Sequence, residues 1–405
     1  MQPGSGRHSY ALNSWIQALA IQRLLPTLQY IVNCFKLPQD GIIRVADLGC
    51  SCGANVINVA NIISASFHTN GASEIQYFFN DLPTNDFNVL FQQLPPLDPT
   101  LGGNQNIDAC SPPLKSNQLN IFESNVQLQQ PILDFGKGTK KMEVETSKRL
   151  YYAAGVPGSF WERLFPSSNL HLIISCHALH WITHFPKFIQ DKTSIAYNKG
   201  QTFINGQNPK AFEACGEAFQ ENLQKFFVHR AIEMASNGIL ILIFCHSWTD
   251  HPTTKINNES PPHTHVDFIT EMCESIWEDF IFEGLITEEL RDSFNFPVYY
   301  PSAKEIHMAV EKSNVFVIQK FEVRENIIAS EMFEQGQQSF LENPDLYGNM
   351  LTKTVRSAFG ELLEGHIGVE LANTYFQRLK QKFAIHVKDS FWKLPNETLL
   401  VLKRK

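Results

Sequence analysis

The sequence predicts an α/β protein with a doubly wound, mostly parallel sheet, an antiparallel edge and a helical cap. Segments with helical spacing alternate with short runs of β-forming residues, and buried strands that alternate with helices form parallel sheets. The last two runs lie close together around Pro395-Asn396, which predicts a terminal antiparallel hairpin. The predicted strands are 44–48, 75–79, 170–175, 239–245, 315–321, 383–387 and 398–402.

Helical spacing outside the strand pattern, at 203–230, 266–291, 331–340 and 351–382, predicts the cap. The segment 95–147 is rich in Pro, Gly, Asn and Gln, which is typical of a long, mobile surface insertion. We therefore expect an N-terminal helix and the first part of the core in 1–202, and cap segments in 203–236, 249–300 and 329–382. The remaining core is expected in 237–248, 301–328 and the terminal hairpin 383–405.

Composition excludes several classes of partner. The chain has 405 residues, of which 43% are hydrophobic and 18% charged, with 33 basic against 41 acidic side chains. A net charge of -8, with one basic cluster at Lys403-Arg404-Lys405, argues against a nucleic-acid partner. The most apolar runs, 170–175 and 238–245, are far shorter than the roughly 20 residues that span a bilayer, so no membrane partner is expected.

The cysteines are expected to be reduced thiols. Eight are scattered along the chain, and only Cys50 and Cys52 lie close together, without a second pair to complete a zinc site. The first residues are polar where a signal peptide would be apolar. These features predict a cytoplasmic protein without a disulfide framework.

The first predicted strand ends in an acid and a turn of small residues. Asp47 is followed by Gly49 and Gly53, which allow a ligand to approach the backbone, and the next helix offers free N–H groups at its start. Ligands of doubly wound folds bind at this carboxyl edge. The spacing is not the G-x-G-x-x-G of dinucleotide enzymes, so a nicotinamide dehydrogenase is the weakest candidate. A glycine turn without a ligand is the alternative.

A second acid, Asp81, ends the next predicted strand. A carboxylate there can accept hydrogen bonds from both hydroxyls of a ribose, as in enzymes that use NAD or S-adenosylmethionine (SAM). The glycine spacing after Asp47 favours SAM, which has no pyrophosphate to hold. Alternatively, Asp81 could cap a helix before Pro83. Near the N-terminus, Tyr10, Ser14 and Gln17 share one helical face, which would suit a ligand or simply solvent.

These motifs, taken in order, resemble the plant SABATH methyltransferases. This family contains the salicylate, benzoate, jasmonate and indole-acetate carboxyl methyltransferases and the caffeine-pathway N-methyltransferases. The resemblance covers nearly the whole chain. It implies a class I methyltransferase fold, SAM as the methyl donor, a small aromatic, indolic or lipid-derived carboxylic acid as the acceptor, and a homodimer. The motifs that carry it are Ser9-Tyr10-Ala11 to Gln17, Asp47-Leu48-Gly49-Cys50, Phe79-Asn80-Asp81-Leu82-Pro83 with Asn85-Asp86-Phe87-Asn88, Gly155-Val156-Pro157-Gly158-Ser159-Phe160, Leu179-His180-Trp181, Asn198-Lys199-Gly200 and Asp292-Ser293-Phe294-Asn295.

The resemblance also implies the residues that bind the donor. Asp81 would hold the ribose, and Ser159 and Phe160 would bracket the adenine, where an aromatic face suits a flat heterocycle. The full set of implied donor contacts is Tyr10, Ser14, Asp47, Gly49, Cys50, Asn55, Asp81, Leu82, Ser159, Phe160 and Cys176.

On the acceptor side, the implied contacts are Gln17 and Trp181, with His177, His180, Thr270 and Tyr299 around them. A carboxylate is already ionised near neutral pH, so we expect positioning by Gln17 and Trp181 and no catalytic acid or base. His177 replaces a tyrosine of many relatives, and Thr270 falls near a second tryptophan of salicylate-type members. Specificity therefore does not transfer from salicylate enzymes.

Four residues match positions where some family members bind Mg²⁺: Asn198, Asp292, Phe294 through its carbonyl, and Asn295. They are hard oxygen ligands. With a single formal charge, the site should bind weakly, and an Asx-turn before Pro297 is the alternative. Any ion there would be structural.

The leading functional hypothesis is formation of a methyl ester from a small carboxylic acid. One alternative is N-methylation of a xanthine-like heterocycle, with His177 as a hydrogen-bond partner. Another is a non-catalytic protein that binds small molecules.

Overall fold

The computed structural model describes residues 13, 24, 26–101, 148–182, 185–205, 207–246, 265–324, 340–390 and 396–405. Most of the predicted insertion 95–147 and most of the predicted helix 331–340 therefore lie outside the described residues. In the described part, no helix is long and apolar enough to cross a membrane.

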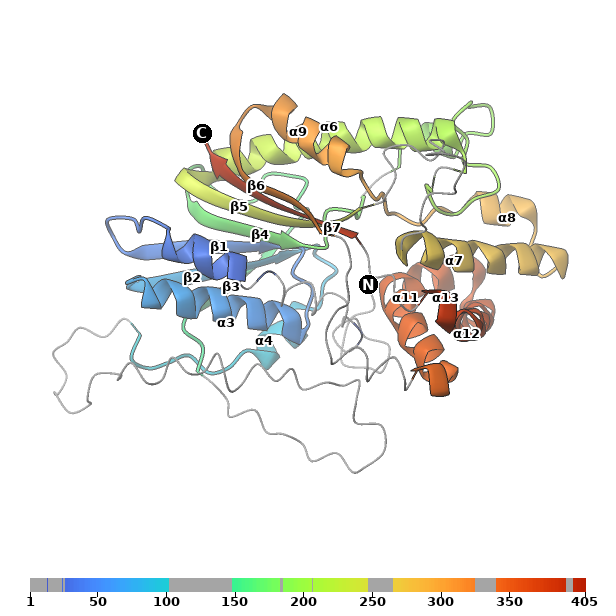
Figure 1. Cartoon of the computed structure of the whole chain (residues 1–405), viewed down its shortest axis with the longest axis horizontal. Helices are drawn as coiled ribbons and strands as arrows, with labels where there is room; N and C mark the ends of the chain where they lie inside the picture. Colours follow the sequence, from blue (N-terminus) through green and yellow to red (C-terminus); the bar gives the residue numbers. More distant parts are fainter. Residues whose placement is uncertain are drawn as a thin grey trace.

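The centre of the protein is a seven-stranded sheet in the order β3-β2-β1-β4-β5-β7-β6 (Figure 1). Neighbouring strands from β3 to β5 are parallel, and β7 runs antiparallel to both β5 and β6. This confirms the doubly wound, mostly parallel sheet with an antiparallel component at one side. The strands are β1 (Ile42–Leu48), β2 (Glu74–Asp81), β3 (Tyr152–Pro157), β4 (Leu170–Cys176), β5 (Met234–His246), β6 (Phe316–Arg324) and β7 (Asn396–Arg404).

The prediction of a terminal hairpin is wrong. The expected strand 383–387 lies instead at the end of α12 (Val369–Ile385) and the start of α13 (Val387–Ser390). Phe383 is buried against Phe268, with ring centroids 5.7 Å apart, so this apolar run packs in the cap. A short apolar run fits a strand and a buried helix equally well, and here packing decides. Strand β7 is therefore inserted between β5 and β6 without a hairpin partner from 383–387.

Strand β3 is absent from the strands that the sequence predicts. It pairs with β2 at the edge of the sheet, and its residues are partly exposed. Gly155 and Pro157 are tolerated because edge strands accept both residue types.

Helices cover both faces of the sheet (Figure 1). The buried cluster on one face includes residues of α3 (Ala54–Thr69) and α4 (Phe87–Gln93), and the cluster on the other includes α6 (Pro209–Glu233) and α9 (Ala303–Ser313). The expectation that 203–236 belongs to the cap is wrong for α6, since Phe219, Leu223 and Phe226 pack in the same cluster as the sheet residues.

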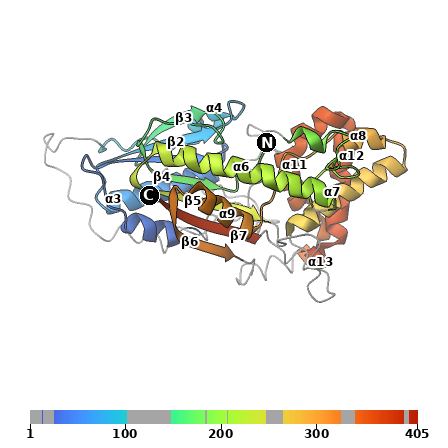
Figure 2. The same cartoon turned by 90° about the horizontal axis from the view of Figure 1, so that it is seen from above.

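A separate helical cap lies at one end of the sheet, and α6 extends from the sheet toward it (Figure 2). Its core is a third buried cluster around Trp277 and Tyr375, with ring centroids 5.8 Å apart. Asn198 lies between the short 3-10 helix η2 (Lys187–Ile189) and α6. Besides α12 and α13, the cap contains α7 (His265–Phe282), α8 (Glu288–Asp292) and α11 (Pro344–Ile367).

Candidate functional site

The turn after β1 packs tightly against the end of β2 and the segment that follows β4. The N–H groups of Gly49 and Cys50 both donate to the carbonyl of Asn80, each at 2.9 Å. Gly49 has φ +76°, and a Cβ there would lie 2.4 Å from the Cβ of Ala178. Glycine is therefore required both by the backbone conformation and by the close approach of the segment after β4.

Asp81 connects the segments expected to hold the donor. Its Oδ2 accepts from the Ser51 N–H at 2.6 Å, and its carbonyl accepts from the Gly158 N–H at 2.9 Å. Its Oδ1 accepts from the Leu82 N–H at 2.8 Å. Burial raises the pKa of Asp81. An ionised carboxylate has about four acceptor positions, so two remain for ribose hydroxyls.

The capping alternative for Asp81 is excluded. The residue that caps the next helix, α4, is Asp86, whose carboxylate accepts from the Val89 N–H at 3.0 Å. Asp81 therefore does not cap α4. It lies at the carboxyl edge of the sheet and is 7% exposed.

The expected adenine contacts lie beside the same turn. A Cβ on Gly49 would be 3.4 Å from Cε1 of Phe160, so the Phe160 ring lies next to the glycine turn. The Ser159 hydroxyl accepts from the Trp161 N–H at 3.3 Å. Asn55 lies in the first turn of α3, where Gly53 provides no side-chain cap, and Leu82 is exposed. These positions are compatible with a flat heterocycle held at the sheet edge.

A buried ion pair holds the loop that carries Phe160. Arg230 and Glu233, near the end of α6, are both fully buried, and Arg230 Nε donates to Glu233 Oε2 at 2.7 Å. Arg230 also donates to the carbonyl of Phe160 at 2.6 Å. The Glu233 carboxylate accepts from the Phe165 N–H at 3.0 Å. The loop 160–165 is thus fixed by charged groups that cannot reach water.

Asp47 has an unusual protonation equilibrium. It is 6% exposed, and the Tyr77 hydroxyl donates to its Oδ2 at 3.3 Å. Burial raises the pKa of Asp47 to about 7, against the hydrogen bond from Tyr77, and the negative charge of Asp81 adds to the rise. Burial also raises the pKa of the thiols of Cys50 and Cys176, which keeps both uncharged.

Asp47→Asn should stabilise the ligand-free protein at about pH 8, because the folded state must ionise a buried carboxyl there. The pKa of Asp47 rises from 3.8 to about 7, so the native state holds the proton more tightly, and this group lowers the free energy of unfolding as pH increases between those values. The advantage of the variant should shrink as pH falls from about 7 toward about 4. Thermal unfolding of both proteins across this range tests the sign, and a difference that is independent of pH would contradict it.

Tyr10, Ser14 and Gln17 lie outside the described residues, so their contacts with donor and acceptor stay predictions. Thr270 is buried on α7. Its contact with an acceptor also stays a prediction.

The ring of His177 contacts side chains from two strands of the sheet. Its Nδ1 lies 2.8 Å from Sγ of Cys245 on β5, and its Nε2 lies 3.4 Å from Oε1 of Glu397 on β7. Burial opposes the charged ring, but Cys245 and Glu397 raise the pKa of His177 to about 10. Both nitrogens face protein groups, although Nε2 has no full hydrogen bond in the described part of the chain, so a contact of His177 with an acceptor stays a prediction.

His180 and Trp181 lie just beyond, among aromatic rings. His180 stacks on Tyr300, with ring centroids 5.3 Å apart, and Trp181 lies 5.3 Å from Phe359 of α11. Burial, with a contribution from the charge of His177, lowers the pKa of His180 to about 3, so the ring is neutral. Its Nδ1 is buried and has no hydrogen-bond partner in the described part of the chain.

The expectation that Tyr299 lies beside the acceptor contacts is wrong. Its hydroxyl donates to Glu305 at 2.7 Å, and a Cβ on Gly216 of α6 would lie 2.6 Å from that oxygen, so Tyr299 faces the sheet-covering helix. Successive residues of an extended segment point to opposite sides, so the aromatic beside His180 is Tyr300. The register that decides this is the pairing of Trp181 with Val298, which the sequence alone does not reveal.

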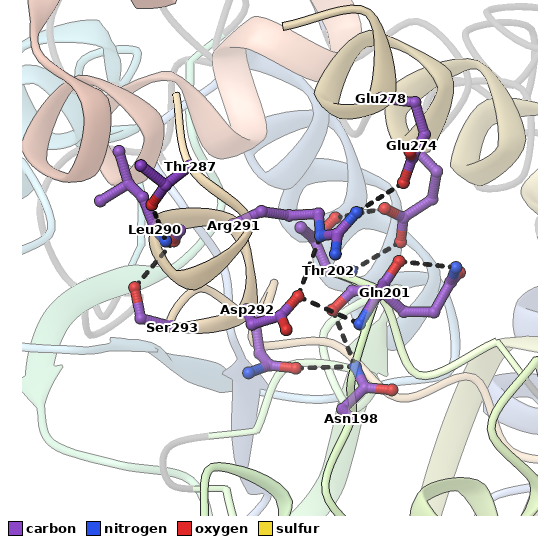
Figure 3. Close-up of polar contacts among 12 residues, drawn as sticks. Asn198, Gln201, Thr202, Glu274, Glu278, Thr287, Leu290, Arg291, Asp292 and Ser293 are labelled. Atoms are coloured by element: carbon purple, nitrogen blue, oxygen red, sulfur yellow. Dashed lines mark hydrogen bonds and ion pairs between the residues drawn. The ribbon is translucent and has the colours of Figure 1, made fainter. Parts of the chain in front are cut away.

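Three of the four predicted magnesium ligands, Asn198, Asp292 and Asn295, lie close together, and hydrogen bonds within the protein already engage several of their polar atoms (Figure 3). Asn198 Nδ2 donates to Asn295 Oδ1 at 2.8 Å, so an amide hydrogen faces an amide oxygen. Asp292 Oδ1 accepts from the Gly200 N–H at 3.0 Å and from Arg291 Nε at 2.9 Å. Phe294 is buried against Trp277 in the cap. A divalent cation binds oxygen ligands, whereas here a guanidinium and an amide N–H point toward the expected ligand oxygens. This arrangement does not fit a divalent cation.

Comparisons with known proteins identify the family. The family model for SAM dependent carboxyl methyltransferases matches residues 1–405. Indole-3-acetate O-methyltransferase 1 of Arabidopsis thaliana is 32% identical over 96% of this chain and 90% of its own length. Probable caffeine synthase 2 of Camellia sinensis is 28% identical over 99% of this chain and 96% of its own. A solved loganic acid methyltransferase with S-adenosylhomocysteine (SAH) superposes with a TM-score of 0.75 at 26% identity, covering 100% of this chain and 98% of that one.

Proposed function

The chain belongs to the family of SAM-dependent carboxyl methyltransferases, and on this premise we propose that it esterifies a small carboxylic acid with a flat aromatic or indolic body. One observation carries the proposal: the glycine turn beside Asp81 touches the segment that leads to His180 and Trp181, at Gly49 and Ala178. This contact supports a site in which the proposed donor and acceptor residues lie at one edge of the sheet.

The reaction requires placement and no proton transfer. When bound, SAM supplies an electrophilic methyl group on a positively charged sulfur. A carboxylic acid with a pKa of roughly 4 is ionised at neutral pH, so its oxygen attacks without a general base. The task of Asp81 and Phe160 is to hold the donor in line with that oxygen.

The acceptor side has surfaces suited to this task. Trp181, Tyr300 and Phe359 offer aromatic faces, and His180 is neutral. Neutral surroundings position a carboxylate without reducing its nucleophilicity as an arginine partner would, and aromatic walls exclude water. Similarity to an indole-3-acetate O-methyltransferase supports a flat, indolic acceptor.

Transfer of labelled methyl from SAM to pooled acids tests this proposal. Separate pools of aromatic, indolic and lipid-derived acids should be compared, and the products treated with alkali, which hydrolyses methyl esters. We expect an alkali-labile product from the aromatic or indolic pool. A lack of labelled ester from every acid pool would contradict the proposal, and tight SAH binding without turnover would then favour a binding protein.

N-methylation of a xanthine-like heterocycle is the second candidate. The buried Nδ1 of His180, which lacks a partner among the described residues, favours it, because a heterocycle could supply the missing hydrogen bond. Similarity to a probable caffeine synthase adds support. An alkali-stable product from a xanthine pool would establish this activity.

We also propose a cytoplasmic homodimer. Support comes from the SABATH resemblance and from exposed apolar side chains on the cap, Phe282, Val369 and Ile385, which are 93%, 59% and 76% exposed. Light scattering at several protein concentrations would measure the oligomeric state.

A further inference from the structure

Arg291, the penultimate residue of α8, lies in the middle of the predicted magnesium site. Its side chain is 6% exposed and forms one ion pair within α8 and one with α7: Nε donates to Asp292 at 2.9 Å, and Nη1 donates to Glu278 at 2.6 Å (Figure 3). A planar guanidinium presents several donors in a fixed fork, so it can satisfy two carboxylates at once.

The neighbouring carboxylates are satisfied from the protein. Glu274 accepts from the N–H groups of Thr202 and Phe203, both at 2.8 Å, and from the Thr202 hydroxyl at 3.0 Å. The Tyr197 hydroxyl donates to Asp292 Oδ2 at 3.3 Å. Oδ1 of Asp292 thus already accepts two hydrogen bonds and Oδ2 accepts one, so a cation could reach Oδ1 only by displacing Arg291 or the Gly200 N–H.

This network supports the acceptor side of the site. The segment after Asp292 continues to Phe296, whose N–H donates to the carbonyl of Thr202 at 2.7 Å. It then pairs with the segment that carries the acceptor residues, since the Tyr299 N–H donates to the carbonyl of His180 at 2.9 Å. A positive charge at Arg291 therefore holds together α7, α8, the loop 197–203 and the strand-like segment beside Trp181.

We propose that the Arg291 guanidinium supplies, from within the chain, the positive charge that a divalent cation would bring to Asn198, Asp292 and Asn295, so that this site assembles without a metal. The Asn198 amide N–H, which also donates to the carbonyls of Gln201 and Phe203 at 3.2 Å, completes the arrangement. The proposal does not depend on the identity of the methyl acceptor.

Thermal unfolding with and without magnesium tests the proposal in the full-length protein. Wild type should give the same Tm in EDTA and in millimolar MgCl₂, with NaCl at matched ionic strength as the screening control. Arg291→Gln should lower the Tm by roughly 5 °C or more, because buried Asp292 loses its charged partner. Magnesium should then restore part of the loss, because Asp292 becomes open to a cation.

Two further variants separate the effect of the charge at Arg291 from the effect of losing an arginine elsewhere. Arg291→Lys keeps the charge but loses the fork, so its Tm should fall less than that of Arg291→Gln and stay insensitive to magnesium. Arg378→Gln removes a partly exposed partner of Glu283 and should change the Tm little. A magnesium-dependent rise in the wild-type Tm would overturn the proposal. So would an Arg291→Gln variant that is as stable as Arg378→Gln, or one that gains no response to magnesium.

Discussion

Asp81→Ala is expected to weaken SAH binding by about 100-fold or more. A hydrogen bond to a charged acceptor contributes roughly 1.5–3 kcal/mol, and two ribose hydroxyls would lose theirs together. The variant also leaves the N–H groups of Ser51 and Leu82 without their carboxylate partner, so a moderate loss of stability should accompany it. Isothermal titration with SAH and urea unfolding measure the two effects separately.

A matched control lies five residues away in the chain. Asp86→Ala removes an acid of the same type, which caps α4 and accepts from the Val89 N–H. It should cost about 1 kcal/mol of stability, as is usual for an N-cap, and leave SAH affinity unchanged. If Asp81→Ala bound SAH as tightly as Asp86→Ala, the placement of the ribose at Asp81 would be wrong.

Arg230→Met is expected to cost about 3–5 kcal/mol of unfolding free energy, because Glu233 would remain as a buried charge without its partner. It would also release the carbonyls of Phe160 and Glu162, which Arg230 binds at 2.6 and 2.7 Å. The loop beside the glycine turn should then lose its fixed position. We therefore expect SAH affinity to fall in the variant even at temperatures where it remains folded.

The control for Arg230 is a surface pair of the same chemistry. Arg378 binds both oxygens of Glu283, at 2.7 and 2.8 Å, but the two side chains are 27% and 44% exposed. Arg378→Met should cost less than about 1 kcal/mol and leave SAH affinity intact. Equal stability of the Arg230 and Arg378 variants in urea would contradict the role of burial. Arg230→Lys should recover little, since an ammonium cannot reproduce the forked contacts.

The donor side was largely predictable from sequence because its signals are local. Asp47, Gly49 and Asp81 lie where strands end, and the carboxyl ends of parallel strands meet at one edge of a sheet. Seven short motifs in one order then led to a family that the comparison over residues 1–405 confirms. The family, its donor and most strands of the sheet follow from the sequence alone.

The acceptor side depended on tertiary contacts. Whether Tyr299 or Tyr300 lies beside His180 depends on the pairing of Trp181 with Val298, residues more than a hundred positions apart. Burial lowers the pKa of His177, and Cys245 on β5 and Glu397 on β7 raise it.

The same reason explains the errors in the fold and the metal site. The apolar run 383–387 is helical because Phe383 packs against Phe268 in the cap. Helix α6 covers the sheet because Phe219 and Phe226 pack in the same cluster as the sheet residues. Arg291 is adjacent to Asp292 in sequence, yet only the arrangement of α7 and α8 directs its guanidinium into the predicted magnesium site. The sequence by itself determined the family, the methyl donor and the sheet edge where we propose that the donor binds. The tertiary structure decided which side chains lie beside His180 and Trp181 and which charges are already neutralised, because both depend on contacts between distant segments.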